Sequence, residues 1–428
     1  MGLVLQDSDR GILIDSRGYI SLASLLNGEG HYRPASRQDL IWPPGYPAFI
    51  YAASGFADPN PLYVGLAQLM LTGLASLVLF KIGTEAGSVG AGVLAALLNA
   101  VSPNTGLWSL TIMSETLFGF FLALGILTWL LYVSRGRSTW LALSGLALGL
   151  GALVRPIGIY LLVVWFLVTL AWNRRGQRRT AALAKSLILV GAAGFVILPW
   201  VARNWQVHGE VVFSRVGQKT LYTFNLATVL ASAEGTSRDL AAGRIGGEDS
   251  EFQDALEVIR KYPGQFAEQQ ALGVLRSTVG VESGVWARLF GYGIERQGGF
   301  GVLTTLLRGQ LANSLDLLWS SFLDPGTFLL MALTVTAILY SMMLYVLSMF
   351  SLGWARGQGR PAVYLVLLIG LTSFYLLLIP GAAGQARFRI PAEPLIAMLA
   401  GFGGIQLRAR VKRPKIGIGN PTPDTGDE

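Results

Sequence analysis

The chain has 428 residues, of which 52% are hydrophobic and only 14% are charged, and its formal net charge is +8. So little polar surface cannot cover a soluble globule of this size, and we expect lipid to cover much of the folded chain. Because cysteine is absent and histidine occurs only twice, the composition excludes disulfides and thiolate nucleophiles and leaves little for zinc sites. The sequence identifies no cofactor, and a bound metal would be a divalent cation such as Mg²⁺ or Mn²⁺ on oxygen ligands.

The apolar residues form long stretches in chain order. Residues 1–61 contain no signal peptide, because Gln6, Asp7, Asp9 and Arg10 interrupt the apolar residues near the N-terminus. The stretches that follow approach or exceed the roughly 17 residues that a membrane-spanning helix needs. The nine lie at 62–81, 87–103, 112–133, 139–154, 157–173, 182–202, 325–350, 361–379 and 391–407, and the fourth and fifth are short. They predict an all-α, polytopic transmembrane helical bundle.

The distribution of lysine and arginine predicts the orientation of this bundle. These residues cluster in alternate connections, which are cytoplasmic by the positive-inside rule, so the net positive charge does not indicate nucleic acid as a partner. The expected organisation is an extracytoplasmic N-terminal loop (1–61), a six-helix transmembrane region (62–202), an extracytoplasmic loop region with short interfacial helices (203–324), a three-helix transmembrane region (325–408) and a cytoplasmic tail (409–428).

The region 203–324 contains one amphipathic pattern. Apolar residues at helical spacing predict a helix lying on the membrane surface, while Arg308 and Asp316 exclude a spanning helix: Leu303, Leu306, Leu307, Leu311, Leu315, Leu318 and Phe322. The segment 250–279 is predicted to be helical and more polar, and 234–249 is predicted to be a mobile loop.

Three polar motifs fall on the predicted outer side. Asp15 begins the segment DSRGYISLA, and WPPGYPAFI follows at 42–50, where paired prolines predict a fixed turn with Trp42 and Tyr46 at the membrane interface. The third segment, SPNTGLWSLTIMSETLF, covers 102–118. In it, one membrane helix ends and Glu115 opens the next, which places this carboxylate at the outer face.

The order of these motifs resembles the GT-C membrane glycosyltransferases that use polyprenyl-phosphate sugars. The similarity is to the branch with protein O-mannosyltransferases, aminoarabinose transferases of lipid A and rhizobial lipopolysaccharide galacturonosyltransferases. It rests on Asp15, Ser16 and Tyr19, then PPGYP, SPN with MSETLF, GALVRP at 151–156, LPWVARN at 198–204, and ARFRIPAEP at 386–394. It implies a GT-C bundle in the bacterial inner membrane that transfers a sugar at the extracytoplasmic face. The acceptor would be a hydroxyl of a glycan, a lipid or a protein.

The resemblance also implies roles for individual residues. Asp15 matches the catalytic aspartate and would be the general base, with inversion at the anomeric carbon. Glu115 matches a second outer acidic residue, which would orient the acceptor or help to bind a cation. The leaving group is a lipid phosphate, for which guanidinium groups are suited, and the candidates are Arg387 and Arg389 first and then Arg155 and Arg203. Tyr19 and Tyr46 would position the substrate.

Simpler structural roles stay open for the same residues. Asp15 would otherwise be a solvated loop residue, and Glu115 would favour the positive end of a helix dipole at a helix start. The arginines would otherwise extend to the interface without a ligand, and the tyrosines would pack. His31 and His208 are predicted to be exposed loop residues.

The sequence departs from the family pattern at its N-terminus. A transmembrane helix normally precedes the catalytic aspartate, whereas the fourteen residues before Asp15 include Asp7, Asp9 and Arg10 and cannot span a bilayer. We expect a longer native chain with one more helix. Rival functions are a transporter or lipid flippase, which would carry charges near the membrane midplane, and an O-antigen ligase or polymerase, which would not share this order of motifs.

Overall fold

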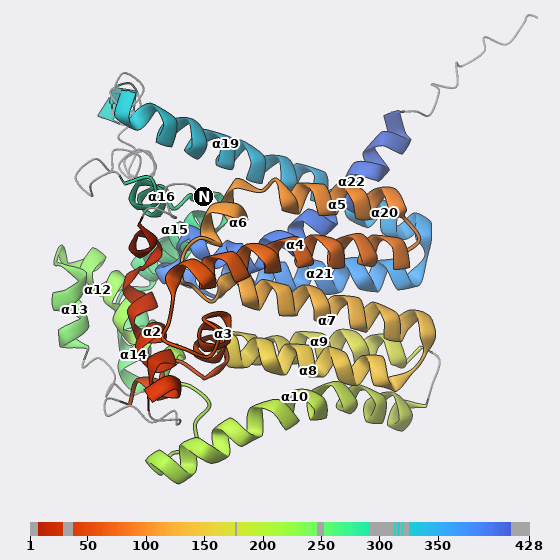
Figure 1. Ribbon diagram of the computed structural model, residues 1–428, viewed down its shortest axis with the longest axis horizontal. Helices are drawn as coiled ribbons and strands as arrows, with labels where there is room; N and C mark the ends of the chain where they lie inside the picture. The colour runs from red at the N-terminus through yellow and green to blue at the C-terminus, as the bar shows by residue number, and fades with distance from the viewer. Residues whose placement is uncertain are drawn as a thin grey trace, which may run out of the picture.

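The computed structural model describes residues 7–28, 37–175, 178–245, 252–291, 312–313, 315–316, 319 and 325–411. Within these residues the secondary structure is helical throughout (Figure 1). Every one of the nine predicted apolar stretches coincides with a helix of the bundle. These helices are α4 (Pro61–Glu85), α5 (Val89–Ala100), α7 (Glu115–Arg135), α8 (Ser138–Val154), α9 (Gly158–Asn173), α10 (Arg179–His208), α19 (Pro325–Ser348), α21 (Arg360–Leu378) and α22 (Glu393–Val411).

Six of these helices are long and apolar enough to cross a membrane, and α5, α8 and α9 are shorter apolar helices. The longest, α10, has 30 residues and continues through Pro199. At about 1.5 Å of rise per residue it exceeds the thickness of the hydrocarbon layer. The three shorter helices each contribute buried residues to the core of the bundle, among them Leu98 of α5, Leu148 of α8 and Trp165 of α9.

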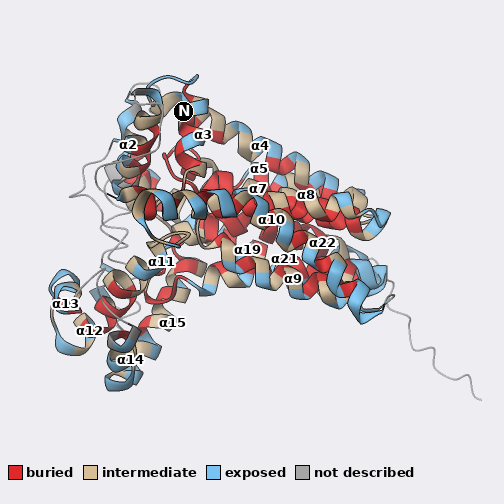
Figure 2. Cartoon of the chain, turned by 90° about the horizontal axis from the view of Figure 1, so that it is seen from below, coloured by how far each residue is buried: buried red, intermediate tan, exposed pale blue. Residues whose placement is uncertain are grey.

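The bundle has a buried centre and an apolar exterior. In the apolar windows of α7 and of the α22 segment 72% and 78% of the residues are buried, against 28% in α10 and 33% in α4. The exterior presents large apolar side chains such as Phe195 and Leu198, which are 77% and 63% exposed. Figure 2 shows the buried residues gathered along the inner faces of the bundle helices. Such apolar exposure suits lipid as the solvent.

Close helix contacts depend on glycine at a few positions. A Cβ atom added to Gly145 of α8 would lie 2.2 Å from the carbonyl oxygen of Leu189 in α10, and one at Gly149 would lie 2.8 Å from that of Ala193. Small residues at i and i+4 therefore let the two backbones touch, as is common between membrane helices.

Short helices form a layer across one end of the bundle (Figure 1). This layer contains η1 (Ser8–Gly11), α2 (Ile14–Gly28), η2 (Gln38–Leu40), α3 (Gly45–Ala53), α6 (Pro103–Trp108), α11 (Val216–Lys219), the π-helix η3 (Thr220–Leu226), α12 (Ala227–Glu234), α13 (Arg238–Arg244), α14 (Phe252–Lys261), α15 (Pro263–Val279), α16 (Ser283–Leu289), η6 (Gly381–Ala383) and η7 (Ala386–Ala392). At the opposite end lie α20 (Ser351–Gln358) and the end of α22.

Several local predictions differ from the structure. The predicted loop 234–249 contains helix α13, which begins after the N-cap Ser237 whose side chain accepts a hydrogen bond from Leu240 N. The predicted proline turn is the start of α3, and Tyr46 is fully buried there rather than at an interface. The predicted amphipathic helix lies mostly outside the described residues. Of its apolar residues, the structure describes Leu315, which is 56% exposed.

Candidate active site

An ion pair joins the first short helix to the connection before the last long one. Asp15 lies in the first turn of α2, and its Oδ2 accepts a hydrogen bond of 2.7 Å from Nη1 of Arg387 in η7. The Asp15 side chain is 38% exposed and that of Arg387 is 24% exposed. Residues 372 positions apart therefore meet at a place that solvent or a ligand can reach.

A second ion pair lies beside the first. Nη1 of Arg155 is 2.5 Å from Oε1 of Glu115, whose side chain is fully buried. The same Nη1 donates to Oγ of Ser114 at 3.2 Å. Ser114 precedes α7 but makes no side-chain cap hydrogen bond there, so its hydroxyl serves the contact with Arg155 and not the helix start.

Phe388 connects the two pairs. The guanidinium carbons of Arg387 and Arg155 lie 5.2 and 5.7 Å from the centroid of its ring. Cations at this distance are attracted by the negative face of an aromatic ring. Asp15, Arg387, Glu115 and Arg155 thus form one contiguous group around Phe388, which we call the ionic cluster.

A third carboxylate adjoins this cluster. Glu282 lies just before α16, and its Oε1 accepts a hydrogen bond of 3.3 Å from the backbone N–H of Arg387. Burial raises the pKa of Glu282, while the nearby Arg387 cation and the backbone hydrogen bonds oppose that rise. Sequence reasoning missed Glu282, because it lies outside every motif and only the tertiary fold brings the loop region 203–324 to η7.

The segment before α7 fixes the position of Asp15. Oγ of Ser16, which is fully buried, donates to the carbonyl oxygen of Ile112 at 2.8 Å and accepts from Leu13 N at 2.9 Å. Ile112 N in turn donates to the carbonyl oxygen of Gly11 at 3.0 Å. The start of α2 is therefore tied to the segment that leads into Glu115, which explains why the two acidic residues share one site.

The two predicted substrate-positioning tyrosines pack behind Asp15. The hydroxyl of Tyr19 lies 3.4 Å from Oγ of Ser114, and burial raises the Tyr19 pKa to about 12, so the hydroxyl stays protonated. The rings of Tyr19 and Tyr46 meet edge to face with centroids 4.8 Å apart. Tyr46 donates to Oε1 of Gln68 at 3.0 Å, so its hydroxyl is already engaged inside the protein.

Arg389 is not brought together with Asp15. Its side chain is 2% exposed, it donates to the carbonyl oxygen of Thr278, and its Nε lies 3.9 Å from Oε2 of Glu393. Oε1 of Glu393 accepts from Ser102 Oγ at 2.9 Å and from Asn104 Nδ2 at 3.0 Å. This sealed network joins the SPN and RIPAEP motifs and holds together the two connections that carry Glu115 and Arg387.

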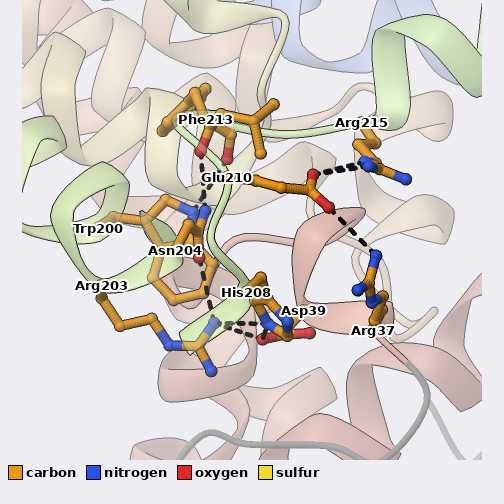
Figure 3. Close-up of polar contacts among 10 residues, drawn as sticks. Arg37, Asp39, Trp200, Arg203, Asn204, His208, Glu210, Phe213 and Arg215 are labelled. Carbon is orange, nitrogen blue, oxygen red and sulfur yellow. Dashed lines mark hydrogen bonds and ion pairs between the residues drawn. The ribbon is translucent and has the colours of Figure 1, made fainter. Parts of the chain in front are cut away.

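Arg203 belongs to a separate group, shown in Figure 3. Its Nη1 pairs with Oδ2 of Asp39, which is fully buried. Nε2 of His208 lies 2.7 Å from the same Oδ2. The prediction of His208 as an exposed loop residue is wrong, since it is the last residue of α10 and its side chain is 9% exposed. Beside this group, Glu210 pairs with Arg37 at 3.1 Å and with Arg215 at 2.6 Å (Figure 3). These contacts hold the segment around Arg37 and Asp39 against the end of α10.

The described residues contain no group of three or more His, Cys, Asp or Glu side chains that could hold a metal ion. Asp15 and Glu115 each face an arginine instead. The chemistry that this arrangement supplies directly is therefore a carboxylate next to guanidinium groups, suited to moving a proton and to holding an anion.

Comparison with known proteins gives one family match. Residues 42–202 match the family model described as dolichyl-phosphate-mannose-protein mannosyltransferase, a segment that contains Glu115 and Arg155 but not Asp15 or Arg387. No curated protein sequence is similar enough to this chain to be matched.

Solved structures give a match over nearly the whole chain. The apo form of the Archaeoglobus fulgidus oligosaccharyltransferase aligns with a TM-score of 0.52 at 13% identity, covering 93% of this chain and 47% of that one. The archaeal oligosaccharyltransferase AglB from Archaeoglobus fulgidus, in complex with an inhibitory peptide and a dolichol-phosphate, aligns with a TM-score of 0.51 at 13% identity, covering 94% of this chain and 48% of that one. ArnT from Cupriavidus metallidurans bound to undecaprenyl phosphate aligns at 14% identity over 95% and 76% of the two chains, with a TM-score of only 0.40.

The present chain spans less than half the length of the archaeal enzyme, so the likeness establishes the fold and not the activity. The chain is a multi-pass membrane protein, and its described residues include six helices long enough to cross a bilayer. Residues 42–202 are similar to the dolichyl-phosphate-mannose-protein mannosyltransferase family, and the chain shares its fold with the part of the Archaeoglobus fulgidus oligosaccharyltransferase that it covers.

Proposed function

We propose that this protein transfers a sugar from a polyprenyl-phosphate donor to an acceptor hydroxyl of a glycan, a lipid or a protein. The observation that carries the proposal is the Asp15–Arg387 ion pair, which is partly open to ligands and lies against the Glu115–Arg155 pair. The match of 42–202 to a mannosyltransferase family supports it, as does the fold of an oligosaccharyltransferase that has been solved with dolichol-phosphate.

The cluster supplies the groups that such a reaction needs. The acceptor oxygen forms a bond to the anomeric carbon, the bond from that carbon to the phosphate oxygen breaks, and its electron pair leaves with the polyprenyl phosphate. Asp15 takes the acceptor proton as general base. Arg387 holds the phosphate, whose negative charge grows as the bond breaks, and Arg155 contributes a second positive charge across Phe388.

The other predicted site residues take supporting roles in this proposal. Glu115 fixes Arg155, and Tyr19 fixes Ser114 beside it, so both orient the cluster instead of reacting. Arg155, Arg389 and Arg203 each pair with a buried acid, so we assign the donor phosphate first to Arg387. Arg155 comes second, because its guanidinium group lies against Phe388 together with that of Arg387.

We infer that the site faces the extracytoplasmic side of a bacterial inner membrane and that the C-terminus is cytoplasmic. Figure 1 places α2 at the bundle end opposite α20. More of the basic residues that flank the bundle helices lie at the α20 end than at the α2 end, which has Arg155, Arg203, Arg387 and Arg389. Those at the α20 end are Arg135, Arg137, Arg174, Arg175, Arg356, Arg360, Arg408 and Arg410. A basic end is cytoplasmic by the positive-inside rule. An extracytoplasmic reporter that is active when fused after Val411 would contradict this orientation.

The proposed activity is tested by label transfer in membranes. Membranes containing the full chain are incubated with a panel of labelled polyprenyl-phosphate sugars, and wild type is compared with Asp15→Asn. Loss of a general base slows transfer by about 10²- to 10⁴-fold. The matched control is Asp239→Asn, which alters a carboxylate that is 96% exposed in α13. Transfer that survives Asp15→Asn at the control rate would remove Asp15 as the base.

A further inference from the structure

The face of α2 that points away from the ionic cluster lines a groove. The groove has a volume of about 520 Å³ and lies between η1, α2 and α16, lined by Asp9, Ile12, Arg17, Ile20, Ser21 and Arg288. Positions 17, 20 and 21 follow the helical spacing of one face. The buried residues Ser16 and Tyr19 lie on the other face, so this groove is separate from the site at Asp15.

Two cations in this groove have no anionic partner among the described residues. Arg17 and Arg288 are exposed, and neither makes an ion pair with another of the described residues. Nearby arginines differ, since Arg10 pairs with Asp7 at 3.2 Å and Arg387 with Asp15 at 2.7 Å. Two guanidinium groups against the single carboxylate of Asp9 leave the groove positive. Guanidinium groups bind phosphate oxygens through two parallel hydrogen bonds.

The surroundings of the groove are apolar. Ile14, the first residue of α2, is 90% exposed, and Ile12 and Ile20 line the groove itself. Exposure of such a side chain to water is unfavourable. In Figure 1, α2 runs across the ends of the bundle helices, and in a bilayer spanned by such helices the lipid headgroups surround their ends. A helix with isoleucine and arginine on one face suits the interface of an anionic membrane.

We propose that this groove binds the headgroup phosphate of an anionic membrane phospholipid through Arg17 and Arg288. The acyl chains of that lipid cover Ile12, Ile14 and Ile20. A lipid bound there holds the outer face of α2, while the contacts of Ser16 hold the inner face. The site is distinct from the donor site, whose phosphate we assign to Arg387.

The proposal predicts selective stabilisation by lipid. The purified full chain in neutral detergent is melted in the presence of dioleoylphosphatidylglycerol, dioleoylphosphatidylcholine or inorganic phosphate. We expect phosphatidylglycerol to raise the melting temperature in a saturable manner and the other two to have no effect, because a ligand that binds only the folded state stabilises it. In Arg17→Gln/Arg288→Gln the affinity for phosphatidylglycerol should fall about 10- to 100-fold.

Matched variants make the outcome specific. Arg178→Gln/Arg260→Gln removes two exposed arginines that also lack an ion pair among the described residues, and it should keep the full lipid effect. The single variants Arg17→Gln and Arg288→Gln should each lose part of the affinity, which tests the idea even if the double variant folds poorly. An unchanged response in the groove variants, or an equal loss in the control, overturns the proposal.

A last experiment measures stabilisation by the donor lipid. Stabilisation by undecaprenyl phosphate should depend on Arg387 and not on the groove. If it is lost in Arg17→Gln/Arg288→Gln and kept in Arg387→Ala, the groove is a donor site and the phospholipid proposal is wrong. If inorganic phosphate alone reproduces the effect of phosphatidylglycerol, the groove binds free phosphate and the proposal is equally overturned.

Discussion

Replacing Arg387 with alanine removes the guanidinium group that faces Asp15 and, in our proposal, the leaving phosphate. The lost contact is a charge-assisted hydrogen bond of 2.7 Å between side chains that are 24% and 38% exposed. An ion pair this open contributes only about 0–1 kcal/mol to stability, because water screens it. Removing one preorganised donor from a developing anion costs far more, about 10²- to 10³-fold in kcat. Activity should therefore fall much further than the yield of folded protein.

The assay measures initial rates of label transfer against donor concentration, normalised to the folded protein recovered by size exclusion. Arg260→Ala serves as the matched control, since this arginine is exposed on α14. We expect Arg387→Ala to lower kcat/KM for the donor by at least 10²-fold. The double variant Asp15→Asn/Arg387→Ala should lose less than the product of the two single losses, because both groups act on one step. If the specific activity per folded molecule is unchanged in Arg387→Ala, the arginine is structural and the reasoning fails.

Three further outcomes are expected. Tyr19→Phe removes a hydroxyl that lies 3.4 Å from Oγ of Ser114 and keeps the ring, so the KM for the donor should rise up to about tenfold. A lower melting temperature with an unchanged KM would show that the Tyr19 hydroxyl serves packing alone. Burial raises the pKa of Glu282, so the wild type should lose stability as the pH rises above the ordinary glutamate pKa of about 4.3. The melting temperature of Glu282→Gln should therefore equal that of the wild type at about pH 4 and exceed it at about pH 8. An equal difference in melting temperature at both pH values would contradict this. Gly145→Ala places a Cβ 2.2 Å from a backbone oxygen and should lower the free energy of unfolding by about 1–3 kcal/mol. As a control, Gly191→Ala meets nothing within 4 Å and should leave the melting temperature unchanged or slightly raised.

The bundle could be predicted because lipid imposes one rule on every spanning segment. A run of apolar residues must become a helix that satisfies its own backbone hydrogen bonds, so 62–81 and 361–379 gave α4 and α21 with small shifts of their ends. The layer of short helices at the α2 end of the bundle follows no such rule. There, short polar segments obey local signals such as the N-cap Ser237, which turned a predicted loop into α13.

The candidate site could be predicted only in part. Asp15, Glu115, Arg155 and Arg387 come from four separate motifs, and the order of those motifs indicated that they belong together before any contact was known. The difference between Arg387 and Arg389 could not be predicted. Both precede the last helix, but η7 is a 3-10 helix with about three residues per turn, so side chains two positions apart point in different directions.

Exposure separates the three acid–arginine pairs that the motifs bring together. Arg389–Glu393 is sealed at 2% exposure on each side, and Glu115 is fully buried against Arg155. Breaking a buried pair leaves an uncompensated charge in a medium of low dielectric constant, so these pairs keep their partners and fix the backbone around them. Separating Asp15 from Arg387 costs little free energy, because water reaches both side chains. The pair able to exchange its internal partner for a phosphate and a hydroxyl is therefore the open one, and the two closed pairs hold it in place.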